Sequence, residues 1–131
     1  MPQFLQNIDQ IGRAKQRDVL GLEFSGFPGH YAANPMREKI LAWLEHKGIA
    51  YMECGGYTSE MRMESYRGQI YIDLPYDVAD PAYLELEAYL EDADGTMRWD
   101  GVRFTLYTLG YCMKNAHHDE PGFWERWAEG F

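Results

Sequence analysis

Hydrophobic and polar positions follow two different periods along the chain, and each change of period marks a new element. Between Phe4 and Ile11 the apolar residues share one side of a helical wheel, which predicts an amphipathic helix within residues 1–17. From residue 19 to residue 25 the period falls to two, because every second side chain from Leu20 to Phe24 is large and apolar. This alternation predicts a strand that ends at a glycine-rich turn.

Two further helices are marked by residues typical of helix ends. An Asn-Pro pair opens the first at residues 34–35, and its apolar stripe stops at Gly48. An Asp-Pro pair opens the second at residues 80–81, and we expect that helix to end at Asp94 and Gly95. Asparagine or aspartate before proline favours a helix start for two reasons. The side chain of the first residue accepts a hydrogen bond from a backbone amide in the first turn. Proline, as the first helical residue, has no N–H group that would be left without a partner.

Short alternating segments lie between and after these helices. Residues 49–54 and 69–74 read as strands, and residues 96–99 and 102–109 flank an Asp-Gly pair that favours a hairpin turn. The tail from Gly110 onward carries Phe123, Trp124, Trp127 and Phe131 at helical spacing. We therefore expect the chain to end in an aromatic helix.

The order of these elements predicts an α/β fold of the α+β type. Strand, helix, strand, strand, helix, strand is the order of the ferredoxin-like split βαβ sandwich, with an antiparallel sheet in the order 4-1-3-2 and both helices on one face. A chain of 131 residues suits a single domain. We divide it into an N-terminal helix (1–17), a ferredoxin-like core (18–109) and a C-terminal extension (110–131).

Composition excludes several classes of protein. No apolar run reaches the ~18 residues that a membrane-spanning helix needs, and the N-terminus lacks a signal-peptide core, so we expect a cytoplasmic protein without a membrane partner. The two cysteines, Cys54 and Cys112, lack a CxxC pattern and lie in apolar surroundings. This favours buried free thiols.

Charge points to a possible partner surface on the second capped helix. The formal net charge is −9, which disfavours direct binding of nucleic acid. Between Asp73 and Asp100 there are nine acidic residues and one basic residue, Arg98. Our hypothesis is that a basic protein binds to this acidic helix and its flanks. The alternative is that the helix is simply solvated and its charges keep the protein soluble. The proposed partner-binding residues are Glu85, Glu87, Glu91, Asp92 and Asp94.

The sheet face opposite the two helices is a second candidate surface. Alternation along the strands predicts that this open face displays Glu23, Tyr51, Glu53, Tyr71, Asp73 and Tyr107, together with Gln69, Arg103 and Thr105. The aromatic side chains need cover, which the chain's own termini, a second subunit of a homodimer or a ligand would supply. Its carboxylates would form an acid/base or metal site if they converged.

The run His117-His118-Asp119 contains side chains that zinc or iron accepts as ligands. Its spacing matches neither HxH nor HExxH, and acids before Pro121 are typical of a helix start. We therefore expect no metal and no cofactor, with His117, His118 and Asp119 as the weak candidates.

No nucleophile elbow, Walker motif or Rossmann glycine pattern occurs in the chain. The leading hypothesis is a non-enzymatic binding or regulatory protein that engages a basic partner through its acidic face. The alternative is a small enzyme that uses carboxylates on the open sheet face or the His/Asp/Glu cluster of the C-terminal segment.

Overall fold

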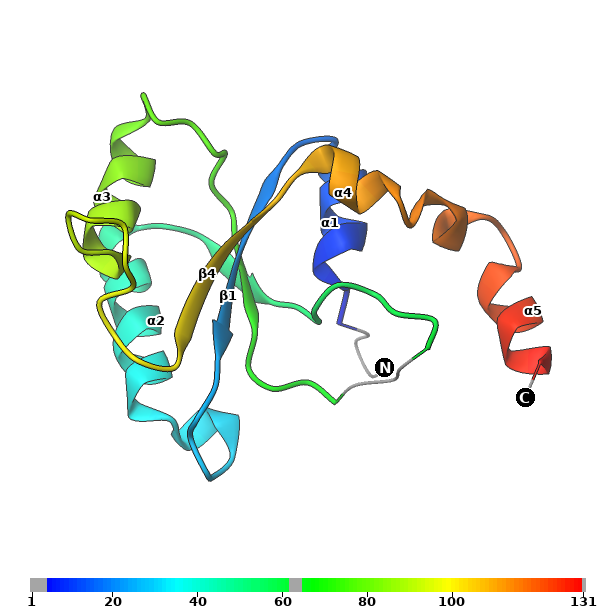
Figure 1. Ribbon diagram of the computed structural model, residues 1–131, viewed down its shortest axis with the longest axis horizontal. Coiled ribbons are helices and arrows are strands. Elements are labelled where there is room, and N and C mark those ends of the chain that lie inside the picture. Colours follow the sequence, from blue (N-terminus) through cyan, green and yellow to red (C-terminus); the bar gives the residue numbers. More distant parts are fainter. Residues whose placement is uncertain (1–4, 62–64, 131) are drawn as a thin grey trace.

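A four-stranded antiparallel sheet separates two layers of helices in the computed structural model, which describes residues 5–61 and 65–130 (Figure 1). The strands are β1 (Val19–Phe24), β2 (Tyr51–Glu53), β3 (Ile70–Ile72) and β4 (Val102–Tyr107). The helices are α1 (Ile8–Lys15), α2 (Pro35–Lys47), α3 (Pro81–Leu90), α4 (Leu109–Met113) and α5 (Phe123–Glu129), with 3-10 turns at Tyr31–Ala33 and Ala116–Asp119. The predicted α+β class is confirmed.

The strands lie in the order β2-β3-β1-β4, which from the other edge reads β4-β1-β3-β2. β1 and β3 are therefore central, and they pair with Leu20 opposite Ile72 and Leu22 opposite Ile70. Residues directly opposite in an antiparallel pair point to the same face, so these four side chains form one apolar patch. That patch faces α2 and α3.

The main core lies between this patch and the two capped helices. Ile40 and Leu44 of α2 and Leu86 and Leu90 of α3 are fully buried against the sheet. Each such side chain contributes about 1.5–3 kcal/mol by leaving water. Burial of these apolar side chains against the patch explains why α2 and α3 pack on the same face of the sheet.

The capping residues act as the sequence predicts. The side chain of Asn34 accepts a hydrogen bond from the backbone of Met36 at 3.0 Å, and that of Asp80 accepts one from Ala82 at 2.9 Å. Gly48 ends α2 with a φ of 72°, a conformation that glycine adopts without strain.

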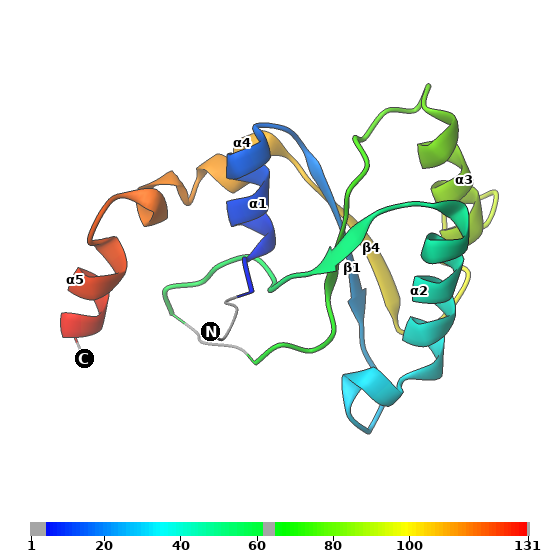
Figure 2. The same ribbon diagram turned by 180° about the vertical axis from the view of Figure 1, so that it is seen from behind.

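A second, smaller core covers the opposite face of the sheet (Figure 2). Ile8 and Ile11 of α1 pack there on Tyr71 and Tyr107, and Cys112 of α4 closes the cluster. The chain's own terminal segments thus cover the tyrosines, which is one of the three alternatives that the sequence leaves open. α5 points away from the sheet and lies apart from this cluster (Figures 1 and 2).

Several predicted boundaries are wrong. Residues 96–99 form no strand and make a single bridge, between Met97 and Glu91, because this segment turns back on the end of α3. α3 ends at Leu90 rather than Asp94, since the Glu91 amide closes the helix on Glu87 and Glu91 is itself extended. β4 stops at Tyr107, where the Thr108 side chain caps the unexpected α4.

The contact between α1 and α4 depends on Gly12. A Cβ atom at this position would lie 2.5 Å from the Cys112 sulfur, far closer than van der Waals contact allows. We expect Gly12→Ala to lower the free energy of unfolding by about 1–2 kcal/mol, because overpacking outweighs the better helix propensity of alanine.

Urea denaturation measures this change, and Gly110→Ala is the matched control. Gly110 lies in α4, and a Cβ atom added there would meet nothing within 4 Å. Its replacement should leave stability unchanged or raise it by about 0.4–1 kcal/mol. Equal effects of the two substitutions would contradict the close approach of α1 and α4.

Candidate functional site

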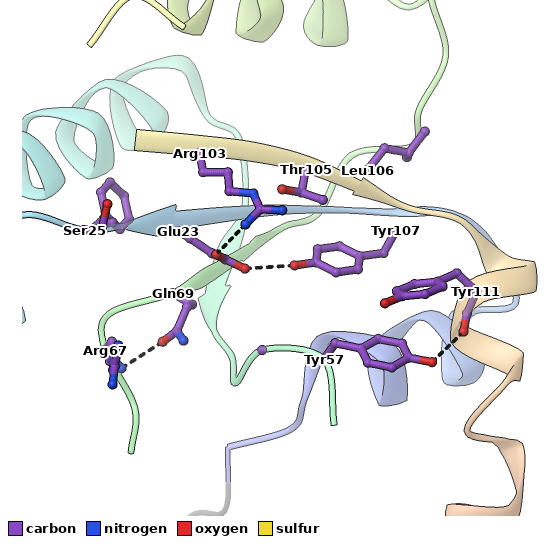
Figure 3. A pocket seen from close by; sticks show the side chains of 12 residues that line it. Glu23, Ser25, Tyr57, Arg67, Gln69, Arg103, Thr105, Leu106, Tyr107 and Tyr111 are labelled. Carbon is purple, nitrogen blue, oxygen red and sulfur yellow. Dashed lines mark hydrogen bonds and ion pairs between the residues drawn. The ribbon is translucent and has the colours of Figure 1, made fainter. Parts of the chain in front are cut away.

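A polar cleft of about 630 Å³ opens on the part of the sheet face that α1 and α4 leave uncovered (Figure 3). Strands β1 and β4 form its floor, and the loops around residues 56–57 and 67–69 form its sides. Its size lies in the range of small-molecule sites, about 300–1,000 Å³.

Glu23 stands at the centre of the floor. It lies opposite Arg103 in the register of β1 and β4, and the Arg103 guanidinium is 4.0 Å from its carboxylate. The Tyr107 hydroxyl donates a hydrogen bond of 2.9 Å to Glu23. Burial and the neighbouring Glu23 charge raise the pKa of Tyr107, so the phenol keeps its proton and remains a donor.

Three tyrosine rings form one wall of the cleft. Tyr57 stacks on Tyr111 with ring centroids 4.2 Å apart, and Tyr107 lies 6.4 Å from Tyr111 at a small interplanar angle. The Tyr57 hydroxyl also donates to the backbone carbonyl of Tyr111 at 3.0 Å. The rings come from a loop, a strand and α4, so tertiary structure alone assembles this wall.

Two arginines also line the cleft: Arg103 stands beside Glu23 on the floor, and Arg67 lies on the side away from the tyrosines (Figure 3). The side chain of Arg103 is 75% exposed, and the Arg67 backbone donates to Gln69 Oε1 at 2.8 Å. The buried Arg37 holds this loop by donating to the Gly68 carbonyl at 3.0 Å. Both arginines are exposed, and the contact of Arg103 with Glu23 is long, so both guanidinium groups can reach an anionic ligand.

The residues that the sequence predicts on the open sheet face lie in three places: in the cleft, under α1, and on the opposite face of the sheet. Glu23 and Tyr107 line the cleft. Tyr71 is buried under α1, and its hydroxyl donates to Asp73, which also binds Arg17 at 2.7 Å. The carboxylates of Glu23, Glu53 and Asp73, which would make an acid/base or metal site if they converged, do not form such a group within the described residues.

Tyr51 and Glu53 lie on the other face of the sheet, which corrects their predicted placement. β2 pairs with β3 so that Tyr51 stands opposite Ile72, whose side chain faces α2 and α3. The Tyr51 hydroxyl donates to Glu45 of α2 at 2.6 Å. The alternation of so short a strand does not define its inward side, and only the pairing register does.

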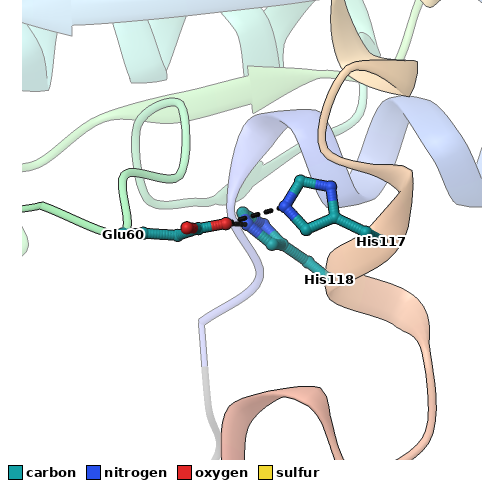
Figure 4. A group of neighbouring side chains, drawn as sticks. All are labelled: Glu60, His117 and His118. Atoms are coloured by element: carbon teal, nitrogen blue, oxygen red, sulfur yellow. Dashed lines mark hydrogen bonds and ion pairs between the residues drawn. The ribbon is translucent and has the colours of Figure 1, made fainter. Parts of the chain in front are cut away.

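The histidine run is split by the structure. Asp119 turns to Arg13 and binds it through two hydrogen bonds of 2.8 and 2.9 Å. The Nε2 atoms of His117 and His118 each lie 2.7 Å from the same carboxylate oxygen of Glu60 (Figure 4). These contacts lower the pKa of Glu60, with His117 as the largest cause. Sequence reasoning missed Glu60, since no pattern links it to residues 57 positions away.

The acidic residues of the α3 region are partly paired with bases. Glu85 lies 3.6 Å from Lys47, and Asp92 lies 3.7 Å from Arg98. Asp94 accepts hydrogen bonds from Thr96 in the following turn. Glu87 and Glu91 stand one helical turn apart.

The two cysteines are buried free thiols, as predicted. Burial raises the pKa of Cys54 to about 12 and that of Cys112 to about 11. Both thiols are therefore protonated at neutral pH and are poor nucleophiles.

Known proteins offer no guide to these sites. Comparison of the chain with family models, with curated proteins and with solved structures finds no match. Within residues 5–61 and 65–130, no helix has the length and apolar character that crossing a bilayer requires.

Asp9 joins the three segments that surround the histidines. Its carboxylate is fully buried and binds Arg13 at 2.9 Å, Asn115 at 3.0 Å and both the amide and the hydroxyl of Thr58. Burial by itself raises the pKa of Asp9, but the hydrogen bonds from Asn115, Thr58 and Arg13 outweigh it and lower the pKa. The folded protein therefore holds Asp9 ionised.

We expect Asp9→Asn to lower the free energy of unfolding by about 3 kcal/mol at pH 7, because it leaves the buried Arg13 charge with only one of its two carboxylate partners, Asp119, and removes the charge that Thr58 and Asn115 donate to. A carboxyl with a lowered pKa contributes stability above its unfolded pKa, near 3.8, and loses it as the pH falls through the folded pKa. The difference from wild type should therefore shrink below about pH 4.

Urea denaturation at pH 7, 5 and 3.5 measures this difference. Asp100→Asn is the control, because Asp100 is exposed and its replacement should change stability by less than about 0.5 kcal/mol. A pH-independent difference for Asp9→Asn would show that the carboxylate charge is not what stabilises the network.

Proposed function

We propose that this is a non-enzymatic binding protein of the cytoplasm, and that its cleft takes a small ligand with one anionic group and one flat aromatic part. The observation that carries this proposal is a cleft with a wall of tyrosines at one end and two arginines, Arg67 and Arg103, at and beyond Glu23. Stacked tyrosines suit an aromatic ring, and guanidinium groups suit a carboxylate or phosphate.

Glu23 adds selectivity to this arrangement. Its carboxylate repels an anion that sits deep on the floor, and it accepts a hydrogen bond from a ligand that carries a donor there. The anionic group of the ligand therefore belongs at the mouth, near Arg67 and the exposed Arg103. This arrangement favours a small ligand over a nucleic-acid strand, consistent with the acidic net charge.

We also propose that residues 18–109 form a ferredoxin-like core within a single domain. The support for this is the element order β1-α2-β2-β3-α3-β4, the sheet order that reads 4-1-3-2 from the β4 edge, and the placement of α2 and α3 on one face. In this description α1, α4 and α5 are additions, and the first two frame the cleft that the core alone lacks.

Two fluorescent probes test the ligand proposal. 1-Anilinonaphthalene-8-sulfonate is aromatic and anionic, and N-phenyl-1-naphthylamine is similar in shape but neutral. We expect the Arg67→Gln, Arg103→Gln double variant to bind the anionic probe about tenfold more weakly, as the loss of one charge-assisted hydrogen bond costs about 1.5–3 kcal/mol. The neutral probe should bind the double variant and wild type alike.

Two further variants test the role of Glu23 and the specificity of the effect. Glu23→Gln should strengthen binding of the anionic probe, because it removes the repelling charge and keeps an acceptor for Tyr107. Arg126→Gln, on α5 and outside the cleft, is the control and should change nothing. The proposal is wrong if Arg126→Gln weakens binding as much as the double variant does.

A second candidate function concerns the α3 surface and a basic protein partner. Leu84, Glu87 and Glu91 follow one another at helical spacing, Leu84 is exposed, and the pKa of Glu91 is raised by burial and by Glu87. An apolar side chain beside two acids that pair with no lysine or arginine of the described residues favours a basic, amphipathic binding partner. The homodimer expected from sequence stays a prediction, which light scattering in solution tests.

Changing Glu85, Glu91 and Asp92 together to lysine tests the α3 surface. If a basic protein binds there, the triple variant should lose a partner that wild type captures at low salt and releases at high salt. The control triple variant, Glu120, Glu125 and Glu129 to lysine, changes the net charge equally on the C-terminal segment and should retain capture. Equal capture by both variants would mean that the acidic residues of α3 only solvate the surface.

A further inference from the structure

A second site, separate from the cleft, lies where the loop before the β3 strand meets the C-terminal segment (Figure 4). Glu60 comes from the loop, and His117 and His118 come from the 3-10 turn Ala116–Asp119. One ligand atom from each of the three residues lies within 4.8 Å of the others. Figure 4 shows both rings directed at the Glu60 carboxylate.

The Asp9 network fixes the backbone on both sides of this cluster. Asp9 binds Thr58, two residues before Glu60, and Asn115, two residues before His117. Asn115 also donates to the Thr58 carbonyl at 3.1 Å, and Arg13 binds Asp119, the residue after His118. The three side chains are thus held by a buried scaffold, although two of them are solvent-accessible.

We propose that Glu60, His117 and His118 bind one divalent zinc ion, with a fourth position left to water. Two imidazole nitrogens and a carboxylate oxygen are a ligand set that zinc takes, and three protein ligands with an open position are the arrangement of exchangeable rather than closed structural sites. Bonds of about 2.0–2.2 Å place tetrahedral ligands about 3.3 Å apart, so Glu60 needs to retreat by about half an ångström. Its side chain is 40% exposed and has room to do so.

A bound ion and hydrogen bonds alone make different demands on the two rings. In a hydrogen-bonded cluster, one carboxylate oxygen accepts from both Nε2 atoms, so both rings carry a proton there. A zinc ion takes the Nε2 lone pairs instead, and the proton of each ring then sits on Nδ1. Nδ1 of His118 is buried and has no hydrogen-bond partner among the described residues in either arrangement, so it is the three converging ligand atoms that favour the ion.

The surroundings of the cluster suit a bound cation. Phe123 and Trp124 pack their rings 4.9 and 4.8 Å from that of His118, which shields one side of the site from water. The network around the histidines contains the carboxylates of Asp9, Asp119 and Glu60, and Arg13 binds the first two of them. This excess of negative charge favours a metal ion over a neutral ligand.

Zinc binding to the full chain, purified without a histidine tag, tests the proposal by calorimetry and elemental analysis. We expect one equivalent per chain, bound with micromolar affinity. Glu60→Gln and His117→Ala should each weaken binding at least tenfold, since even the loss of an outer-shell partner costs about 10–100-fold. Both positions are exposed, so neither variant should unfold.

Matched controls separate this site from the other polar surface of the protein. His46→Ala removes an exposed histidine of α2, and Glu120→Gln removes an exposed carboxylate next to the cluster in sequence. Both should bind zinc as wild type does. Failure to bind zinc at millimolar concentration, or binding that survives the Glu60→Gln, His117→Ala double variant, would overturn the proposal.

A spectroscopic measurement places the ion independently of affinity. The Trp124 ring is 4.8 Å from that of His118, so cobalt added in place of zinc should quench its fluorescence. Trp127 lies 5.4 Å from Trp124 and is close enough to be quenched too, so the Trp124→Phe, Trp127→Phe double variant should remove most of the cobalt-dependent change and keep stoichiometric zinc binding. A change that persists in this double variant would put the ion elsewhere and contradict the assignment. Neither readout uses the cleft, so failure of this proposal leaves the cleft proposal standing.

Discussion

The buried ion pair of Asp9 and Arg13 is the interaction on which the position of the C-terminal segment after β4 depends. Both side chains leave water, which costs several kcal/mol per charge unless every hydrogen-bonding position is satisfied. Thr58, Asn115 and Asp119 supply the remaining partners, from a loop and from the segment after α4. A single helix of eight residues thereby holds together two segments that lie outside the sheet.

This constraint also shapes the two candidate sites. Because α1 covers Tyr71 and part of Tyr107 but not the far ends of β1 and β4, the sheet face is divided into a buried half and an open half. The open half becomes the cleft. The same α1 brings Glu60 to the histidines, since its Asp9 binds both neighbouring segments at once. The position of one short helix therefore shapes both the candidate cleft and the cluster of Glu60 with the two histidines.

The two sites differ in how their polar groups are satisfied. In the cleft, Glu23 and Tyr107 are already bonded to each other, and Arg67 and Arg103 are exposed, although Arg103 lies 4.0 Å from Glu23. That combination fits reversible binding of an anion at the mouth. In the cluster, two imidazole nitrogens and a carboxylate oxygen converge on one point. That set of donor atoms fits a divalent metal ion.

The sequence by itself determined the elements that local chemistry controls. The Asn-Pro and Asp-Pro starts of α2 and α3, the end of α2 at Gly48 and the inward side of β1 were all predictable, because capping and alternation act within a few residues. The two buried thiols followed from their apolar neighbours. The end of α3, the missing strand at 96–99 and the helix α4 were not predictable, because each depends on a contact with a neighbouring segment.

Only the tertiary structure decided which polar residues meet. Glu23 and Tyr107 were predicted to share a face, whereas Tyr51 and Glu53 lie on the other one because the pairing register of a three-residue strand, and not its own pattern, sets its inward side. Asp119 binds Arg13 and not the histidines. The carboxylate beside the histidines is that of Glu60, which is 57 residues from His117 in the sequence. Periodicity records which side of an element is apolar. It contains no information about which distant loop a buried carboxylate will bind. The contacts of Asp9 with two distant segments are of this kind, and both candidate sites depend on them.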